Sequence, residues 1–150
     1  MSVIDKFIKY RKNKDTFCSA VIVAAGNSQR MGKDKILMPI KDKPVIAYTL
    51  ETFQNSDCID EIIVVTKLDN LVAISDICNK YGITKTSKVV CGGKSRAESS
   101  LAGVQYVSED ASLIAIHDGA RPFVTESVID RTAAALSQIK DVPDGKLTSL

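Results

Sequence analysis

Residues 21–35 read VIVAAGNSQRMGKDK, and this stretch passes from an apolar, β-branched run into a glycine turn and then into a basic segment. The apolar run begins at Ser19 and ends at Ala25, and it is too uniformly apolar for a strand with one face in water. We therefore expect residues 19–25 to form a strand that is buried on both faces. The turn and the basic segment would then leave the carboxyl end of that strand.

Three further segments have the composition of buried strands: EIIVVTK at 61–67, TSKVVC at 86–91 and SLIAIH at 112–117. Longer runs with helical periodicity separate them. Pro44 stands in a first-turn position before the run VIAYTLETF. Asp69 is expected to cap the run LVAISDICNKY, and Gly82 follows that run.

Two more helices have recognisable beginnings. Ser95 opens a capping box in which the Glu98 carboxylate would return to the N–H of the cap residue. Thr125 is expected to cap the run ESVIDRTAAALSQI. Alternating strands and helices of this kind predict an α/β fold, a Rossmann-like, doubly wound and mostly parallel sheet with right-handed crossovers.

In such sheets ligands bind outside the carboxyl ends of the strands, where the loops from strand to helix lie. Three loops are therefore the candidate sites: AAGNSQRMGKDK at 24–35, CGGKSRAES at 91–99 and HDGARP at 117–122.

Composition sets limits on the class of protein. A chain of 150 residues that is 45% hydrophobic can form one domain with a core. The net charge of +2 gives no reason to expect a nucleic-acid partner. The four cysteines lack CxxC spacing, which favours reduced, mostly buried thiols over a metal site or a disulfide framework. Without a long apolar run or a signal-peptide core, we expect a cytoplasmic protein with no transmembrane segment.

The first loop matches neither of two common phosphate-binding motifs. Ser28 occupies the position two residues after Gly26 where GxGxxG requires glycine. Five residues separate Gly26 from Gly32, and Asp34 follows Lys33, so the spacing of a P-loop is not met either.

What the first loop does offer is a turn of small residues next to positive charge. The backbone N–H groups of Ala24, Ala25 and Gly26 can approach a phosphate or a base closely. Arg30 and Lys35 would supply cations to the same crevice. The alternative is an ordinary solvated basic loop.

The second loop combines a tight turn with the start of a helix. Gly92 and Gly93 allow the turn, and the free N–H groups of the helix favour an anion or a base carbonyl. Ser99 would add a directional hydroxyl one turn later. The alternative is that the glycines and the capping box only begin a helix.

The third loop carries a carboxylate and a guanidinium. Asp118, at a strand end, suits a hard divalent cation that bridges phosphates, and Arg121 suits a phosphate or a carboxylate. The alternative is a structural Asp–Arg pair. His117, the only histidine, is expected to be a packed imidazole at the strand end and not a general base.

Taken together, these motifs resemble those of the 2-C-methyl-D-erythritol 4-phosphate cytidylyltransferase family of the nonmevalonate isoprenoid pathway. The resemblance runs from about Ser19 to Leu136 and rests on AAGNSQRM, on DK before ILMPIKDKPVIAYTL, on GGKSRAESSLAGV and on IHDGARPFV. SQRMGKDK is also similar to the start of molybdenum-cofactor nucleotidyltransferases. HDGARP favours the isoprenoid enzymes over those and over ribitol-5-phosphate cytidylyltransferases.

The resemblance implies transfer of a cytidylyl group from CTP to 2-C-methyl-D-erythritol 4-phosphate, with release of pyrophosphate and with Mg²⁺ as cofactor. Arg30 and Lys35 would be catalytic and would stabilise the charge of the transition state. Nucleotide-binding residues would be Ala24, Ala25, Gly26, Gly93, Ser99 and Asp118. Asp118 would also hold the metal ion and, with Arg121, contact the acceptor.

The sequence departs from the family pattern in three places. Ser28 stands where glycine is usual, and Lys94 stands where an acidic residue is common. Beyond about Ser137 the resemblance fades, whereas family members continue into further strands, a dimerisation arm and residues that hold the acceptor phosphate.

The expected organisation is therefore a basic N-terminal extension at 1–17, a nucleotidyltransferase-like domain at 18–139 and a polar tail at 140–150. CTP and a polyol phosphate are the expected partners, and a homodimer is left open because the usual arm is missing. The alternatives are a transferase for ribitol 5-phosphate or another small substrate, and a nucleotide-binding module without turnover.

Overall fold

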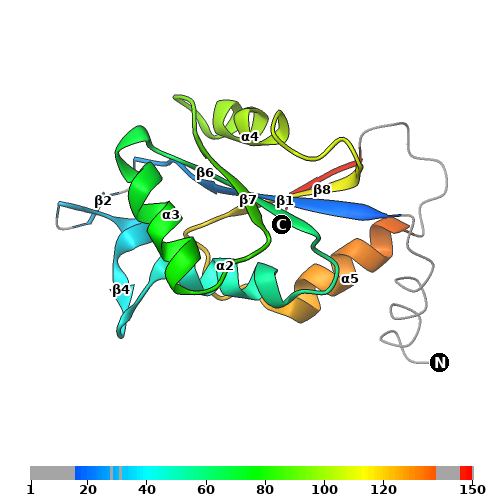
Figure 1. Cartoon of the computed structure of the whole chain (residues 1–150), viewed down its shortest axis with the longest axis horizontal. Coiled ribbons are helices and arrows are strands. Elements are labelled where there is room, and N and C mark those ends of the chain that lie inside the picture. Colours follow the sequence, from blue (N-terminus) through cyan, green and yellow to red (C-terminus); the bar gives the residue numbers. More distant parts are fainter. Residues whose placement is uncertain (1–15, 28, 31, 138–145, 150) are drawn as a thin grey trace.

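A five-stranded parallel sheet organises the computed structural model, which describes residues 16–27, 29–30, 32–137 and 146–149 (Figure 1). Every neighbouring pair of strands in this sheet is parallel. The strands lie in the order β7 (Thr86–Cys91), β6 (Glu61–Thr66), β1 (Phe17–Ala24), β8 (Ala111–Asp118) and β9 (Lys146–Ser149). All four strands predicted from the sequence are confirmed. Residues 146–149, in the segment expected to be a polar tail, form the edge strand β9.

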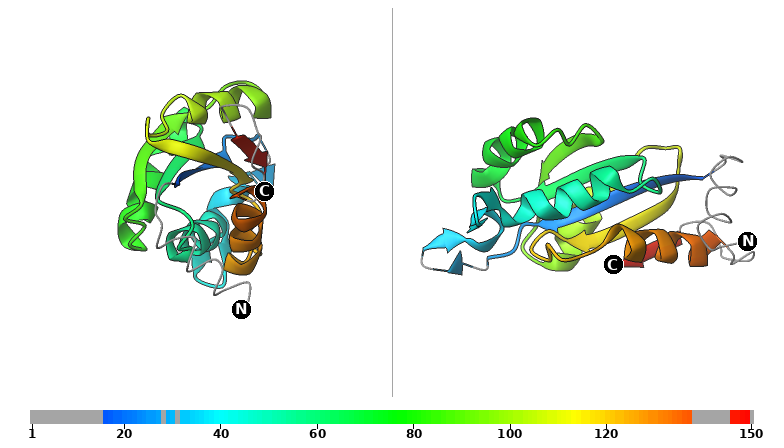
Figure 2. Two further views of the ribbon diagram at one scale, coloured as in Figure 1. Left: turned by 90° about the vertical axis from the view of Figure 1, so that its right-hand side faces the viewer. Right: turned by 90° about the horizontal axis from the view of Figure 1, so that it is seen from below.

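Helices cover both faces of the sheet, which confirms the doubly wound fold. On one face lie α2 (Val45–Asn55), α3 (Leu71–Lys80) and α5 (Glu126–Ser137), and on the other lies α4 (Arg96–Val104) (Figures 1 and 2). The central strand β1 contributes side chains to the hydrophobic core on both faces of the sheet. Ile22 packs in the cluster under α2, and Val21 packs in the cluster under α4. Both side chains are fully buried, as the apolar composition of this strand predicts.

Helix α2 turns a continuous apolar stripe to the sheet. Ile46, Leu50 and Phe53 recur at helical spacing and have no exposed surface. Burial of such a side chain contributes about 1.5–3 kcal/mol. The Phe53 ring lies 5.2 Å from the imidazole ring of His117, so this helix also supports the end of β8.

Helix α4 approaches the sheet closely because Gly103 has no side chain. A Cβ at this position would lie 2.3 Å from Cγ1 of Val21 and 2.7 Å from Cγ2 of Val65. The close packing fixes α4 over β1 and β6. It also places the N-terminus of α4 near the carboxyl ends of these strands.

Several predicted helix ends are confirmed. The Ser95 hydroxyl accepts a hydrogen bond of 3.1 Å from the Glu98 N–H, and the Thr125 hydroxyl accepts one of 3.3 Å from the Val128 N–H. Gly82 follows α3 with a φ of +65°, a conformation that side chains disfavour.

Three details of the helix starts differ from expectation. The Glu98 carboxylate accepts from the Lys94 N–H at 2.6 Å, one residue before the cap, because the chain turns sharply there. Asp69 lies inside a 3₁₀ turn, η2 (Leu68–Asn70), so Asn70 and not Asp69 is the N-cap residue of α3. Pro44 is itself the N-cap of α2, which begins at Val45.

Short elements connect β1 to α2 at one end of the molecule (Figure 1). They are β2 (Gln29–Arg30), β3 (Lys33–Asp34), the 3₁₀ turn η1 (Lys35–Leu37), β4 (Pro39–Ile40) and β5 (Lys43–Pro44). Here β2 pairs with β3 and β4 with β5, both antiparallel.

The expectations about the cysteines and the membrane can also be compared with the structure. Cys18, Cys58 and Cys78 are buried free thiols, and Cys91 is an exposed one. In the described ranges, no helix has the length and apolarity needed to cross a bilayer. The expected N-terminal extension at 1–17 lies almost wholly outside the described residues.

Candidate nucleotide site

A pocket of about 650 Å³ opens at the carboxyl ends of β1, β7 and β8, and all three predicted loops contribute to its walls. Every predicted site residue whose side chain is described lines this pocket: Ala24, Ala25, Gly26, Lys35, Gly93, Ser99, Asp118 and Arg121. The side chain of Arg30 lies outside the described residues, so its role stays a prediction. The topology therefore gathers residues that are up to 97 positions apart, from Ala24 to Arg121, into one crevice.

The first and second loops touch each other in the pocket wall. A Cβ at Gly92 would lie 2.5 Å from Cβ of Ala25 and 2.6 Å from Oγ of Ser99, so only glycine fits there. Gly26, in contrast, is exposed and has no atom within 4 Å of where its Cβ would be. The backbone of Gly26 is thus open to a ligand.

In the second loop, Ser99 holds the glycine turn. Its hydroxyl is buried and accepts a hydrogen bond of 3.1 Å from the Gly93 N–H. The N-terminus of α4 lies beside this turn and contributes partial positive charge to the pocket.

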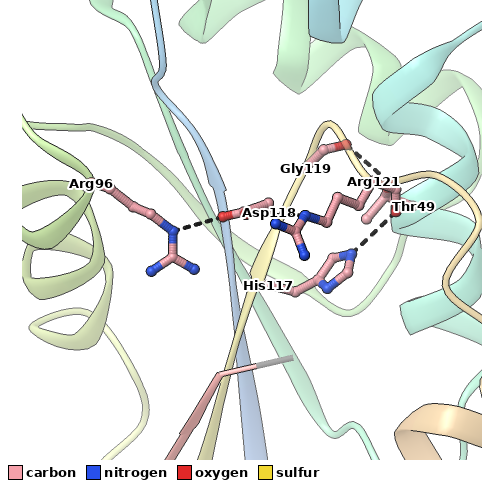
Figure 3. A network of polar contacts seen from close by, with 6 residues as sticks. All are labelled: Thr49, Arg96, His117, Asp118, Gly119 and Arg121. Carbon is pink, nitrogen blue, oxygen red and sulfur yellow. Dashed lines mark hydrogen bonds and ion pairs between the residues drawn. The ribbon is translucent and has the colours of Figure 1, made fainter.

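In the third loop, one carboxylate lies between two guanidinium groups (Figure 3). Nε of Arg96 is 2.9 Å from Oδ1 of Asp118, and Nε of Arg121 is 3.4 Å from Oδ2. The side chains of Arg96 and Arg121 are 52% and 71% exposed, so water screens both pairs. The predicted Asp–Arg pair exists and lies in the pocket wall. A structural Asp–Arg pair and a pair that contacts a ligand are therefore compatible interpretations of this loop.

Buried contacts fix the course of this loop (Figure 3). Thr49 donates a hydrogen bond of 2.9 Å from its hydroxyl to the Gly119 carbonyl. Nε2 of His117 lies 3.2 Å from the Arg121 carbonyl, and the ring is only 3% exposed. The interpretation of His117 as a packed imidazole at the strand end is confirmed.

Two of the three lysines in the pocket wall, Lys67 and Lys35, differ in their pairing. Nζ of Lys67 is 2.7 Å from Oδ1 of Asp34, while Nδ2 of Asn70 donates a hydrogen bond of 2.8 Å to Oδ2. The bonds from Lys67 and then Asn70 hold the pKa of the Asp34 carboxyl below its ordinary value. The ammonium of Lys35 forms no ion pair or hydrogen bond with any other residue in the described part of the chain.

Sequence reasoning missed four of these side chains: Asp34, Lys67, Asn70 and Arg96. Arg96 could have been found, because a basic residue directly after the cap of a helix that faces an anion site is itself a candidate. Lys67 follows the end of a central strand. It could have been found by the rule that ligands bind outside the carboxyl ends of parallel strands, which also gave the three loops. No local signal indicates that Asp34 pairs with Lys67.

The donors in the pocket suit a divalent cation only in part. Among the described residues, no group of three or more His, Cys, Asp or Glu side chains could hold a metal ion. Mg²⁺, however, is commonly bound by one or two carboxylates together with phosphate oxygens and water. The Asp118 carboxylate therefore fits a cation that arrives with the phosphates of a ligand.

The pocket wall contains five basic residues and two carboxylates, together with a helix N-terminus and an exposed glycine backbone. The basic residues are Lys35, Lys67, Lys94, Arg96 and Arg121, and the carboxylates are those of Asp34 and Asp118. These features suit a polyphosphate that must be aligned and neutralised. Together with the parallel sheet, they define an α/β protein of the nucleotidyltransferase type.

Comparison with known proteins gives the family. The family model of IspD, 2-C-methyl-D-erythritol 4-phosphate cytidylyltransferase, matches residues 18–143. The enzyme of that name from Clostridium botulinum (strain ATCC 19397 / Type A) is 46% identical over 114 residues, which are 75% of this chain and 50% of that enzyme. The one from Halalkalibacterium halodurans is 37% identical over 131 residues, or 83% and 57% of the two chains.

A solved structure agrees with these relatives. The crystal structure of 4-diphosphocytidyl-2C-methyl-D-erythritol synthase from Anaerococcus prevotii has a TM-score of 0.72 and 33% identity, covering 83% of this chain and 52% of that one. The chain therefore belongs to the 2-C-methyl-D-erythritol 4-phosphate cytidylyltransferase family. It spans about half the length of the curated relatives that it matches.

Proposed function

We propose that this chain transfers the cytidylyl group of CTP to 2-C-methyl-D-erythritol 4-phosphate. The observation that carries the proposal is the convergence of the three loops on one pocket, with Lys35, Arg96 and Arg121 around it and Asp118 between the two arginines. Membership of the family supports the same reaction.

The reaction needs alignment and charge stabilisation more than a covalent group from the protein. An oxygen of the acceptor phosphate forms a bond to the α-phosphorus of CTP. The bond from this phosphorus to the oxygen that leads to the β-phosphate breaks, and pyrophosphate leaves with that electron pair. Lys35, with the predicted help of Arg30, would stabilise the negative charge that spreads over the phosphoryl oxygens.

Other residues would position the two substrates. The backbone of Ala24, Ala25 and Gly26 would accommodate the phosphates and the sugar. Gly93, held in place by Ser99, would contact cytosine. Asp118 and Arg121 would lie next to the acceptor phosphate.

Mg²⁺ is the proposed cofactor, and Asp118 would hold it together with the phosphates. When bound, the ion would neutralise charge on the triphosphate and on the leaving pyrophosphate. A cytoplasmic location belongs to the proposal because charged CTP is retained inside cells.

A titration followed by an assay in the same sample tests the proposal. The chain would be titrated calorimetrically with CTP and Mg²⁺, with GTP as control, and pyrophosphate release would be measured after adding 2-C-methyl-D-erythritol 4-phosphate. Binding of CTP with release of pyrophosphate is expected. Release with ribitol 5-phosphate alone would favour the other acceptor, and the lack of both binding and release would refute the proposal.

The alternative function, the binding of nucleotide without turnover, would use the same pocket, whose walls the described residues of this chain form. Saturable CTP binding with no pyrophosphate from either acceptor would identify this function.

A further inference from the structure

The pocket wall contains an ion-pair cluster that the proposed reaction leaves without a role. Asp34 ends β3 and directly precedes Lys35. Its two carboxylate oxygens bind different partners, Nζ of Lys67 at 2.7 Å and Nδ2 of Asn70 at 2.8 Å. The side chains of Asp34 and Lys67 are only 15% and 22% exposed, so water screens this pair less than the pairs around Asp118.

Both partners of Asp34 are themselves fixed. The Asn70 N–H donates a hydrogen bond of 3.0 Å to the Lys67 carbonyl and closes the turn η2 directly after β6. Asn70 is the N-cap residue of α3, yet its side chain makes no capping hydrogen bond and is directed to Asp34 instead. An amide that could cap the helix thus binds the segment before Lys35.

The cluster also makes Lys67 different from Lys35. Lys67 is neutralised by Asp34, whereas the ammonium of Lys35 forms no ion pair or hydrogen bond with another described residue. Because β6 is a buried central strand paired with β1 up to Thr66, its end is a rigid anchor. A contact between this anchor and Asp34 restricts the backbone from which the Lys35 side chain extends.

We propose that Asp34, held by Lys67 and Asn70, is a positioning residue that fixes Lys35 in the pocket. The inference rests on the proposed function, in which the Lys35 ammonium stabilises the transition state. A displacement of about 1 Å in such a group costs up to about a hundredfold in rate. The loss is expected in kcat more than in substrate binding, since other residues also bind the triphosphate.

The test compares three variants with a matched control. Asp34→Ala removes the carboxylate, Asp34→Asn removes only its charge, and Asp34→Asn/Asn70→Asp returns a carboxylate to the cluster from the other side. The control is Glu51→Ala, because Glu51 forms an ion pair of the same 2.7 Å length with Lys43, which is 26% exposed and outside the nucleotide pocket. Thermal melts would establish that each variant is folded.

Kinetics and calorimetry give the main result. We expect Asp34→Ala to lower kcat about tenfold to a hundredfold and to change the Kd for CTP less than threefold. The double variant should recover at least threefold in kcat over Asp34→Asn, and Glu51→Ala should match the unmodified chain. A kcat within twofold of the unmodified chain for Asp34→Ala, an equal loss in Glu51→Ala, or no recovery in the double variant would overturn the proposal.

Hydrogen exchange at residues 34–38 separates this inference from the proposed function. Faster exchange in Asp34→Ala, with unchanged exchange in Glu51→Ala, is expected whether or not CTP is the substrate. If the unmodified chain neither binds CTP nor releases pyrophosphate, the proposed function fails and the exchange result alone decides. Unchanged exchange in Asp34→Ala would then show that Asp34 does not restrict the backbone of this segment.

Discussion

Nε of Arg96 lies 2.9 Å from Oδ1 of Asp118 and so joins the beginning of α4 to the end of β8 across the pocket. Arg96 comes from the second predicted loop and Asp118 from the third, and 22 positions separate them. Because the arginine side chain is half exposed, this ion pair contributes only about 0.2–1 kcal/mol to folding. Its importance is therefore expected in ligand binding and not in stability.

The first prediction concerns Arg96→Gln. This variant should weaken CTP binding about tenfold, because a charge-assisted hydrogen bond contributes about 1.5–3 kcal/mol and Arg96 lines the pocket. Its free energy of unfolding should change by less than about 1 kcal/mol. Calorimetric titration and urea unfolding measure the two effects. The control is Arg131→Gln, an exposed arginine on α5 whose Nε contacts the Ser127 carbonyl at 3.3 Å; equal weakening in that variant would contradict the prediction.

The second prediction concerns the ammonium of Lys35. Lys35→Met should reduce kcat for pyrophosphate release by about a hundredfold to a thousandfold, as the loss of a group that stabilises transition-state charge does in other enzymes. Stability should change little, since no described partner is left unpaired. Lys35→Arg keeps the charge and should retain more activity than Lys35→Met. Activity of Lys35→Met within tenfold of the unmodified chain would contradict a catalytic role.

The third prediction compares two glycines of the pocket. A Cβ at Gly92 would overlap Ala25 and Ser99, so Gly92→Ala should destabilise the fold by about 1–3 kcal/mol. A Cβ at Gly26 would meet nothing in the free protein, so Gly26→Ala should leave the free energy of unfolding within about 0.5 kcal/mol. If a nucleotide passes over Gly26, however, the same methyl group would obstruct it and weaken CTP binding.

Urea unfolding and titration of both glycine variants check this comparison. Weaker CTP binding in Gly26→Ala at unchanged stability would place the ligand against the first loop. Unchanged CTP binding in Gly26→Ala would exclude a close approach of the ligand there.

The sequence was sufficient to predict four of the five strands of the sheet and the edge at which the pocket lies. Residues 20–25 and 62–65 are all apolar, and only a strand between two helix layers buries both of its faces in this way. The carboxyl ends of neighbouring parallel strands meet at one edge, so the three loops could be brought together without any coordinates.

Three features of the structure were not predicted from the sequence, and each has its own reason. The first is a contact between side chains that meet only in the folded chain. Asp34 and Lys67 are 33 positions apart, and neither has a local pattern that identifies the other. The cap of α3 was placed at Asp69 because a 3₁₀ turn before a helix has no distinct composition. Strand β9 was not predicted because its sequence, KLTS, contains only one apolar residue. An edge strand can form with fewer apolar residues than a central strand.

The fourth prediction concerns Glu61, which ties three elements together at the end of the sheet opposite the pocket. Its carboxylate accepts hydrogen bonds from the hydroxyls of Ser19 and Ser87, both at 2.6 Å, and from the Ser108 N–H at 2.9 Å. Burial by itself would raise the pKa of Glu61, but the three hydrogen bonds favour the charged form, and together they bring the pKa below its ordinary value of 4.5.

A lowered pKa makes Glu61 a source of stability that depends on pH. Below pH 4.5 the unfolded chain binds a proton at this position more readily than the folded chain does. Stability therefore decreases as the pH decreases. The contribution of Glu61 is complete above its unfolded pKa and disappears as the pH falls through the lower, folded value. Glu61→Gln should therefore destabilise the protein at pH 7 by about 1–3 kcal/mol, and this difference should shrink between pH 5 and pH 3.

Urea unfolding at a series of pH values from 7 to 3 measures this difference directly. Glu109→Gln is the control, because Glu109 is exposed and the substitution should leave stability nearly unchanged over the whole range. A destabilisation by Glu61→Gln that stays constant with pH would mean that the shape of the side chain, and not its charge, holds β1, β7 and the turn before β8 together. A destabilisation that becomes smaller as the pH is lowered would show that the carboxylate itself supports the end of the sheet opposite the pocket.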